Sequence, residues 1–512
     1  MKKLLTWGAA GLITMALLDP LLYSLLDQPI ILSANASCSD PPFIHADWSY
    51  CDKQKENLSN ANLMVANLSY ANLTNADLTN ADLLVANLSN ANLSGANLSR
   101  AKLAGADFDR TNLRGANLTG VTGLSSTQLH NAATLQGVNL SALNLESFDL
   151  RSSNLARANL ARTDLTNADL TNADLTGVAL TGANLSGARL ANATLTGAVL
   201  TGVDTLTNTH LRSASDVQGV RLSQINLTNW NLSSLNLTGA DLAGANLTNA
   251  DLSNANLTTA NLHHANLLGA SFSGVNLTGA NLQGTNFTDF QLRGAASLTG
   301  VNLSGVTLSN YDLSFLILPG VNLSAADLTN TDLHGADLSH SNLTNANLAA
   351  ANLAEANLTG ATLAGANLAK AKLSGANLTG ATLTGAILTK AALTRANFNR
   401  ASLTGALNLT NDQLRTMSNL QGINLSDCNL SDFDLSSLNL ADANLSKADL
   451  SNANLTSTNL IKGNLAGANL TNANLTNADL KDTNLKNANM TGTKGVPSPA
   501  EDTTTESEED PP

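Results

Sequence analysis

A large apolar residue, nearly always Leu, recurs at every fifth position over most of this 512-residue chain. We call this residue the centre of a repeat. Centres begin at Leu58 and end at Met490, with four breaks between them. The residue two before a centre is usually Ala, and the residue directly before it is mostly Asn or Asp. A period of five fits neither an α-helix nor a simple strand alternation.

One repeat cannot fold by itself. Burying one Leu contributes about 2–3 kcal/mol, whereas ordering five residues costs about 5–10 kcal/mol. Successive turns of the chain must therefore stack, so that hydrogen bonds and packing between them offset the cost. Between residues 58 and 490 only Pro319 could interrupt such a stack. The period thus predicts a solenoid that buries Leu and Ala and exposes the other three residues.

The pattern A(D/N)LXX, clearest in ANLTNADLTNADL from Ala71 to Leu83, resembles that of the pentapeptide repeat family. The resemblance covers roughly residues 58–490. It implies an all-β solenoid, a right-handed quadrilateral β-helix with four repeats in each coil and the centre and the preceding Ala pointing inward. Eighty centres would then form about 20 coils, and a rod of roughly 95 Å at a spacing of about 4.8 Å between coils.

Each of the four breaks in the period is followed by a related sequence. Three breaks are 17 residues from centre to centre, and the fourth is six; they run from 118 to 135, 200 to 217, 403 to 420 and 292 to 298. The modules that follow begin 82, 81 and 122 residues apart, which are multiples of 20 with remainders of two, one and two. The spacing supports a 20-residue coil independently of the resemblance and places all four modules on one face.

The three long breaks predict short helical excursions near residues 124–134, 206–216 and 409–419. In each, Ser or Thr is followed three residues later by Gln or His, which is the spacing of a capping box; the pairs are Ser125 with Gln128, Thr207 with His210, and Thr410 with Gln413. We expect the Leu that follows in each helix to pack back on the coil; these are Leu129, Leu211 and Leu414. No helix is predicted at the short break.

Each module also replaces one inward Ala by an aromatic residue: Phe148, Trp230, Tyr311 and Phe433. Protein interiors are close packed, so large inward residues beside an excursion would fill the space where the coil is disturbed. We therefore interpret the four as structural aromatics. A groove for a ligand or partner is the alternative interpretation.

The N-terminal end differs from the repeats. Residues 1–36 have a basic start, an apolar run and the sequence Ala-Asn-Ala at 34–36, which is typical of an export signal peptide. An uncleaved membrane anchor is the alternative. Export would place the protein in a periplasm, a thylakoid lumen or the extracellular space. Residues 37–57 are predicted to form an N-terminal cap segment, in which Cys38 and Cys51 could form a disulfide.

The C-terminal end carries much of the negative charge. The chain has a formal net charge of −13, and six of its acids lie between Glu501 and Asp510 without a basic residue. Residues 491–512 are therefore predicted to be a disordered acidic tail, next to a coil of weak charge. Nothing in this pattern resembles a basic nucleic-acid footprint, so nucleic acid is not expected as a partner.

No arrangement of residues in the sequence predicts catalysis. The seven His are scattered and form no ladder of ligands between coils, so no metal site is expected. Acidic residues such as Asp77 and Asp82 alternate with Asn in one position of the repeat and are interpreted as solvated turn residues. We expect no catalytic residue and no cofactor, and hence a protein that is not an enzyme.

Three functions remain open. The favoured one is a non-enzymatic exported scaffold, a protein-interaction rod for an unknown protein or envelope partner, which would contact the membrane only if residues 1–36 stay attached. The second rests on the resemblance, because some pentapeptide repeat proteins mimic duplex DNA and bind type II topoisomerases. The weakly acidic coil departs from that pattern. The third is a surface-binding or glycan-binding β-helix.

Overall fold

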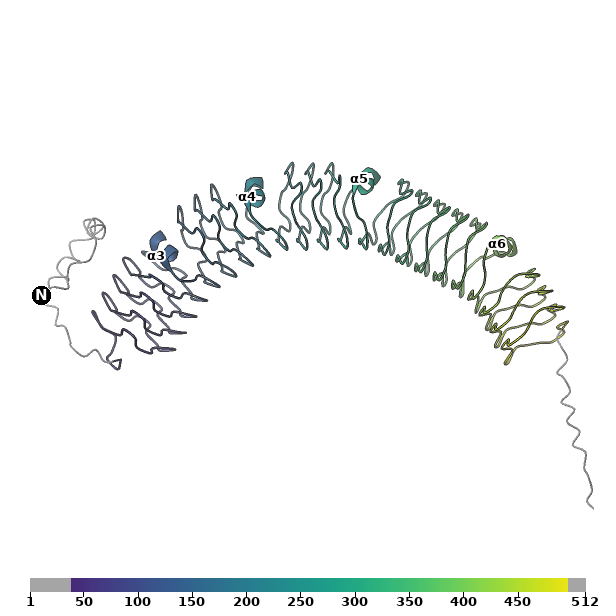
Figure 1. The fold of residues 1–512 in the computed structure, drawn as a ribbon, viewed down its shortest axis with the longest axis horizontal. Coiled ribbons are helices and arrows are strands. Elements are labelled where there is room, and N and C mark those ends of the chain that lie inside the picture. The colour runs from purple at the N-terminus through teal and green to yellow at the C-terminus, as the bar shows by residue number, and fades with distance from the viewer. Residues whose placement is uncertain (1–37, 496–512) are drawn as a thin grey trace, which may run out of the picture.

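The computed structural model describes residues 38–495, which form one continuous solenoid (Figure 1). Adjacent coils pair through parallel β-bridges of single residues, and in the regular coils the paired residues are 20 positions apart, as in Asn67 with Asn87 and Asn72 with Asn92. Bridges recur at every fifth residue, so each coil has four sides. The described residues contain these isolated bridges rather than extended strands, because each side is too short to extend the pairing.

In a repeat with Asn or Asp before its centre, every backbone N–H has a partner. In residues 87–91, four N–H groups donate to backbone carbonyls at 2.8–3.0 Å; the acceptors are Ala66, Asp107, Asp109 and Leu88. The fifth, that of Ser89, donates to Oδ1 of Asn87 at 3.0 Å. Buried or half-buried backbone groups must be paired, so an Asn or Asp before the centre completes the hydrogen bonding of its own repeat.

The second residue after each centre turns the corner of the coil in the left-handed conformation. The φ angle is 57° at Asn90 and 68° at Gly95, as the third position of a type II turn requires. Asn and Gly tolerate positive φ, which explains why they so often follow the centres at this distance. Val65 and Val85 adopt the same conformation, with φ of 58° and 57°, although a β-branched side chain disfavours it.

The interior consists of centres and of the small residues two positions before them. Leu88 and Ala86, for example, are fully buried. Outside, the amides of successive coils form ladders, as where Nδ2 of Asn112 donates to Oδ1 of Asn92 at 3.0 Å. The outer polar residues therefore repeat the coil-to-coil pairing of the backbone.

Four short helices interrupt the coils: α3 (Ser126–Asn131), α4 (Asn208–Ser213), α5 (Asp289–Gly294) and α6 (Asn411–Thr416). The predicted helices at the three long breaks are confirmed as α3, α4 and α6, and the Leu of each is buried. Helix α5 corrects the sequence analysis, which expected none at the short break. Leu292 is the buried apolar residue of this helix and not the centre of a coil repeat. Thr288 and Gln291 form the same capping box as in α3 and α6.

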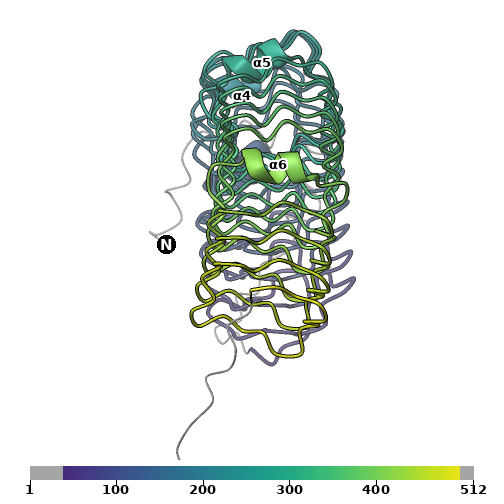
Figure 2. The same ribbon diagram turned by 90° about the vertical axis from the view of Figure 1, so that its right-hand side faces the viewer.

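The solenoid is an arc with the helices along its convex edge (Figure 1), and Figure 2 shows α4, α5 and α6 in one file. Residues paired across a helix-bearing coil are 22, 22, 21 and 22 positions apart, as in Asn117 with Asn139, Val199 with Arg221, Asn281 with Asn302, and Ser402 with Asn424. A helix is about 10 Å wide, twice the spacing of the coils. It separates neighbouring coils on one side only, so the stack bends and the predicted rod is curved into an arc.

The first coil begins ahead of the predicted boundary at residue 58. Asp47 and Asp52 already form bridges to the next coil, and the ring of Trp48 is buried beneath the ammonium of Lys53, 4.1 Å from the ring centroid. Residues 37–57, predicted as a separate cap, thus include the first turn of the solenoid. A disulfide joins Cys38 to Cys51, whose Cα atoms are 5.5 Å apart.

The last bridge joins Asn474 to Lys494, so the coil continues past the predicted boundary at residue 490. The predicted export segment, residues 1–36, and the acidic residues after Gly495 lie outside the described part of the chain. Within residues 38–495, no helix has the length and apolar character needed to cross a membrane.

Replacing Val85 by Asn is expected to stabilise the protein by about 1 kcal/mol, because the left-handed conformation is strained for a β-branched residue and tolerated by Asn. Calorimetric unfolding, with hydrogen exchange of the coils next to residue 85, would measure the gain. Val85→Thr is the matched control, because Thr keeps the branched Cβ. Equal stability of the two variants would contradict the interpretation.

Candidate functional site

The helices on the convex edge are the candidate functional site, because there the structure departs from its repeat. Each helix interrupts the backbone pairing of the coil before it. In a regular coil the carbonyl of the inward Ala accepts an N–H from the next coil, as Ala66 does from Asn87 at 2.9 Å. Where a helix replaces that N–H, another donor must reach the buried carbonyl.

A buried glutamine supplies this donor beneath three of the helices. In α6, Nε2 of Gln413 donates to the carbonyls of Leu388 and Ala391, both at 2.8 Å. Its Oε1 accepts the N–H of Thr410 at 2.8 Å and so caps the helix. Gln128 in α3 and Gln291 in α5 make the same three bonds. One amide therefore satisfies the coil below and the start of the helix together.

His210 takes the place of this glutamine in α4. Its Nδ1 accepts the N–H of Thr207 at 3.0 Å, so the ring hydrogen resides on Nε2, which donates to the carbonyl of Ala188 at 3.2 Å. Burial lowers the pKa of His210, and the bond to Ala188 acts in the opposite direction. A neutral ring is required, because a protonated Nδ1 could not accept the Thr207 N–H.

Each helix is also bonded to the coil that follows it. The first residue of α6, Asn411, accepts the backbone N–H of Asp434 on Oδ1 at 2.8 Å. Near the end of the helix, Nη1 of Arg415 donates to the carbonyls of Asp434 and Ser436 at 2.8 and 3.3 Å. Arg212 in α4 and Arg293 in α5 make equivalent pairs of contacts. The helices therefore bond firmly to both neighbouring coils.

The four predicted aromatics all lie in the coil directly after a helix. Phe148, Trp230, Tyr311 and Phe433 each precede the residue whose backbone the helix contacts, and all four are half-buried against the core. Tyr311 also donates its hydroxyl to the carbonyl of Phe287. Side chains in this position fill the space between a helix and the coil that follows it.

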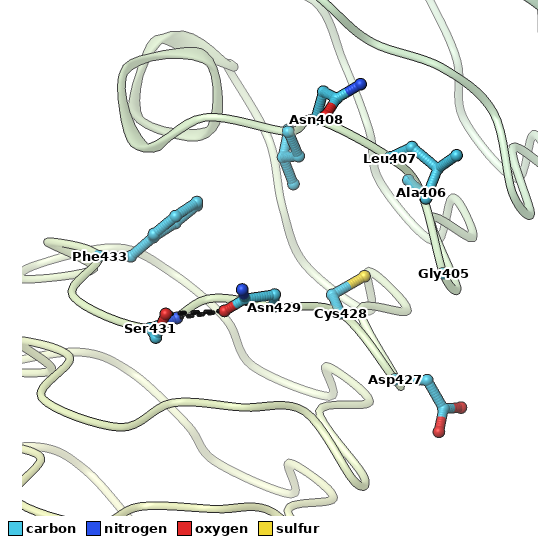
Figure 3. Close-up of a pocket in the computed structure, with 10 residues that line it drawn as sticks. Gly405, Ala406, Leu407, Asn408, Asp427, Cys428, Asn429, Ser431 and Phe433 are labelled. Carbon is cyan, nitrogen blue, oxygen red and sulfur yellow. Dashed lines mark hydrogen bonds between the residues drawn. The ribbon is translucent and has the colours of Figure 1, made fainter.

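A hollow of about 380 Å³ lies beside α6, between residues 405–409 and the coil that carries Cys428 and Phe433 (Figure 3). The residues in the equivalent position to Cys428 in the other modules are larger: Leu143, Ile225 and Val306. The smaller side chain explains the hollow here. The thiol is buried and donates to the carbonyl of Leu403 at 3.1 Å, and burial raises its pKa, so it stays protonated.

The acidic residues of the coils are held by their own repeats. The carboxylate of Asp77 accepts the hydroxyl and the N–H of Thr79, at 2.5 and 3.0 Å, and these bonds lower its pKa. Such a group is a poor proton donor at neutral pH. In the described part of the chain, no three His, Cys, Asp or Glu side chains are grouped so that they could hold a metal ion.

Four large apolar residues are exposed around α5, and we call Leu268, Phe290, Phe315 and Ile317 the crest patch. Their exposed fractions are 60, 82, 66 and 68%. Helix α5 contacts the coils that carry the other three: Gln291 donates to the carbonyl before Leu268, and Arg293 to the carbonyl before Phe315. The sequence analysis missed this patch, although SFLILPG from residue 314 places bulky apolar residues in outward positions.

Replacing His210 by Gln is expected to remove a pH dependence of stability. The pKa of His210 is lower in the folded than in the unfolded chain, where it is near 6.5. Stability is therefore complete above about pH 6.5 and falls as the pH drops through that value. Hydrogen exchange of α4 at pH 7.5 and pH 5 would show increased opening at pH 5 in the native protein. His130→Gln, which changes an exposed His, is the control and should keep that dependence.

Replacing Gln413 by Leu is expected to destabilise the α6 region by about 1–3 kcal/mol, because two buried carbonyls and the N–H of Thr410 lose their partner. Gln421→Leu is the matched control, since Gln421 is half-exposed and its amide bonds to the exposed Asp442. Local unfolding measured by hydrogen exchange would separate the two variants. A Gln413→Leu protein with unchanged protection of residues 386–436 would contradict this role.

No curated protein matches the chain. Among solved structures, HetL, a pentapeptide repeat protein involved in heterocyst differentiation regulation in the cyanobacterium Nostoc sp. strain PCC 7120, is 26% identical over 56% of this chain and 93% of its own, with a TM-score of 0.16. A pentapeptide repeat protein from the thylakoid lumen of Arabidopsis thaliana is 34% identical over 19% of this chain and 66% of its own, with a TM-score of 0.18. QnrB1, a plasmid-mediated fluoroquinolone resistance protein, is 19% identical over 38% of this chain and 90% of its own, with a TM-score of 0.25.

The family profile described as Pentapeptide repeats matches most of the chain, at residues 57–83, 86–121, 133–172, 173–204, 226–263, 255–294, 270–310, 308–345, 341–380, 376–407, 418–456 and 453–492. Pentapeptide repeat proteins form right-handed quadrilateral β-helices and are generally non-catalytic. With a profile match of this extent and the four-sided, 20-residue coil of the structure, the chain belongs to the pentapeptide repeat family.

Proposed function

We propose that this protein is a non-enzymatic exported scaffold that holds a protein partner on its convex edge. The crest patch is the observation that carries the proposal. Exposed apolar side chains gathered in one region mark interaction sites on soluble proteins, and aromatic residues dominate the energy of such contacts. The patch surrounds α5 near the middle of the arc (Figure 1), where a partner can reach it from outside.

The polar groups of the convex edge favour a scaffold over an enzyme. The buried polar side chains of the helices, namely Gln128, His210, Gln291 and Gln413, bond to the coil and to the helix caps. A catalytic site needs groups that converge on a substrate, and these groups converge on backbone carbonyls. The family is generally non-catalytic, which supports the same assignment.

An oxidising compartment is the proposed location. The disulfide between Cys38 and Cys51 is of the kind that persists in secreted, periplasmic and lumenal proteins. The relative from the Arabidopsis thylakoid lumen is 34% identical, although it covers only 19% of this chain. We therefore propose a periplasm, a thylakoid lumen or the extracellular space.

A DNA mimic is disfavoured by the charge of the coil. Mimicry of a duplex requires a continuous anionic surface. Residues 356–411, which form almost three coils, contain five Lys and Arg and no Asp or Glu. This basic stretch would interrupt an anionic surface, so we do not propose a topoisomerase as the partner.

Replacing Phe290, Phe315 and Ile317 by Ser, Ser and Thr is expected to reduce partner binding by at least tenfold, because exposed aromatic anchors each contribute about 1–3 kcal/mol to such contacts. Proximity labelling from the tagged protein in its native cells would identify the partner, and binding to the purified partner would give the loss. Tyr70→Ser removes a half-exposed aromatic far from the crest and serves as the control.

Two results would contradict the proposal. Equal labelling by the crest variant and the native protein would remove the crest patch as the contact surface. A mature protein found only in the cytosol by cell fractionation would contradict export.

A further inference from the structure

One surface of the solenoid carries positive charge without internal partners. Lys370, Lys372, Lys390 and Arg395 lie on or at the corners of the convex side, in the two coils before α6, and we call them the basic strip. All four are exposed. Lys370 and Lys390 occupy the same corner in consecutive coils, with φ of 62° and 56°. The backbone N–H of Lys370 donates to the carbonyl of Thr389 at 2.8 Å.

The structure connects the strip directly to α6. Lys372 forms a bridge with Ala392, and the backbone N–H of Arg395 donates to Thr416, the last residue of α6, at 2.7 Å. The ion pairs and side-chain hydrogen bonds found among the described residues include none to these four side chains. The sequence from 356 to 411 contains no carboxylate, so this group of exposed cations is suited to an anionic partner from another part of the chain.

The described chain ends on the same side of the coil. Bridges link Asp434 to Asn454, Asn454 to Asn474, and Asn474 to Lys494, and Asp434 lies in the coil directly after α6, as its bond to Asn411 shows. The described chain therefore ends on the helix-bearing side of the coils, C-terminal to α6 and in line with the basic strip. We propose that the acidic segment Glu501–Asp510 of the same chain docks on the basic strip.

Distance and charge both agree with this occupant. The strip is five to six coils from Lys494, or about 30–35 Å, because α6 on this path adds about the width of one coil to the usual spacing. From Gly495, residues 501–510 reach from about 20 to 50 Å when extended. The segment carries six acids and no basic residue. Attachment to the same chain raises its effective concentration to the millimolar range, so several weak ion pairs suffice to hold it.

Other charged residues lie along this path, and some of them are paired. Asp434 is bonded to Arg415, with the nearest side-chain atoms 3.1 Å apart. Asp412 and Asp432 are the other carboxylates next to α6. Lys481, Lys486 and Lys494 lie closer to the exit point, beside Asp479 and Asp482, and are the competing targets for the segment.

Carbodiimide crosslinking of the full-length protein would test the proposal, because it joins a carboxylate to a lysine only when the two are in contact. At low ionic strength we expect crosslinks from Glu501–Asp510 to Lys370, Lys372 and Lys390 within one chain, and their loss at 0.5 M NaCl as screening takes effect. Mass spectrometry of the monomer band identifies the joined residues.

One arginine substitution tests the strip without removing a lysine, and a second supplies the control. Arg395→Gln leaves every lysine in place and should reduce the crosslinks to the strip by about twofold or more. Arg157→Gln changes an exposed residue at the same kind of turn, with φ of 60° against 61° at Arg395, and should leave the crosslinks unchanged. Crosslinks mainly to Lys481, Lys486 and Lys494, an even distribution over all lysines, or links found only between two chains would each overturn the proposal.

Discussion

The supply of hydrogen bonds to the backbone is the constraint on which this structure depends. A coil with one bridge residue on each side satisfies four of the five N–H groups in a repeat through backbone carbonyls. The fifth is satisfied by a side-chain oxygen in most repeats, where the Asn or Asp before the centre supplies it, as Asn87 does for Ser89. The repeat is thus defined by two requirements at once, an apolar pair for the interior and an amide or carboxylate beside it.

The same requirement explains the helices. A helix that replaces one side of a coil removes N–H groups that the neighbouring coil needs, and a buried Gln, or His210 in α4, replaces them. The helix is also thicker than a coil, so it opens the stack on one side. Hydrogen bonds therefore hold each helix to its neighbouring coils, while the thickness of the helix bends the solenoid into an arc (Figure 1).

Most polar side chains are used for this internal pairing, which leaves function to the residues that depart from the repeat on the outside. Exposed apolar residues gather around α5, whereas exposed cations gather before α6. Leu268, Phe290 and Phe315 lie on the convex side or at its corners, as the basic strip does, whereas Ile317 lies on the adjoining side of the coil, where it bridges to Asp337. The proposed partner contact and the proposed docking of the acidic segment would therefore share one edge of the arc, several coils apart.

Much of the fold could be read from the sequence, because a strict period exposes the coil directly. The 20-residue coil, the buried Leu and Ala, and three helices followed from spacing and from capping pairs such as Ser125 with Gln128. Helix α5 was not predicted because Leu292 continues the period of five, and the break after it is only one residue longer than a repeat. The start of the coil at Asp47 was not predicted because Trp48 and Lys53 occupy centre positions that usually hold Leu.

Other features were decided only in three dimensions. The curvature arises because every helix lies on the same edge of the solenoid and is thicker than a coil. The crest patch and the basic strip join residues from different coils, and a period cannot show which outward residues stay without a partner. The sequence by itself determined the repeating unit, because its hydrogen bonds and its core are local to five residues and their neighbours one coil away. The tertiary structure decided the curvature and the surface, because both depend on how many coils, with their interruptions, are stacked together.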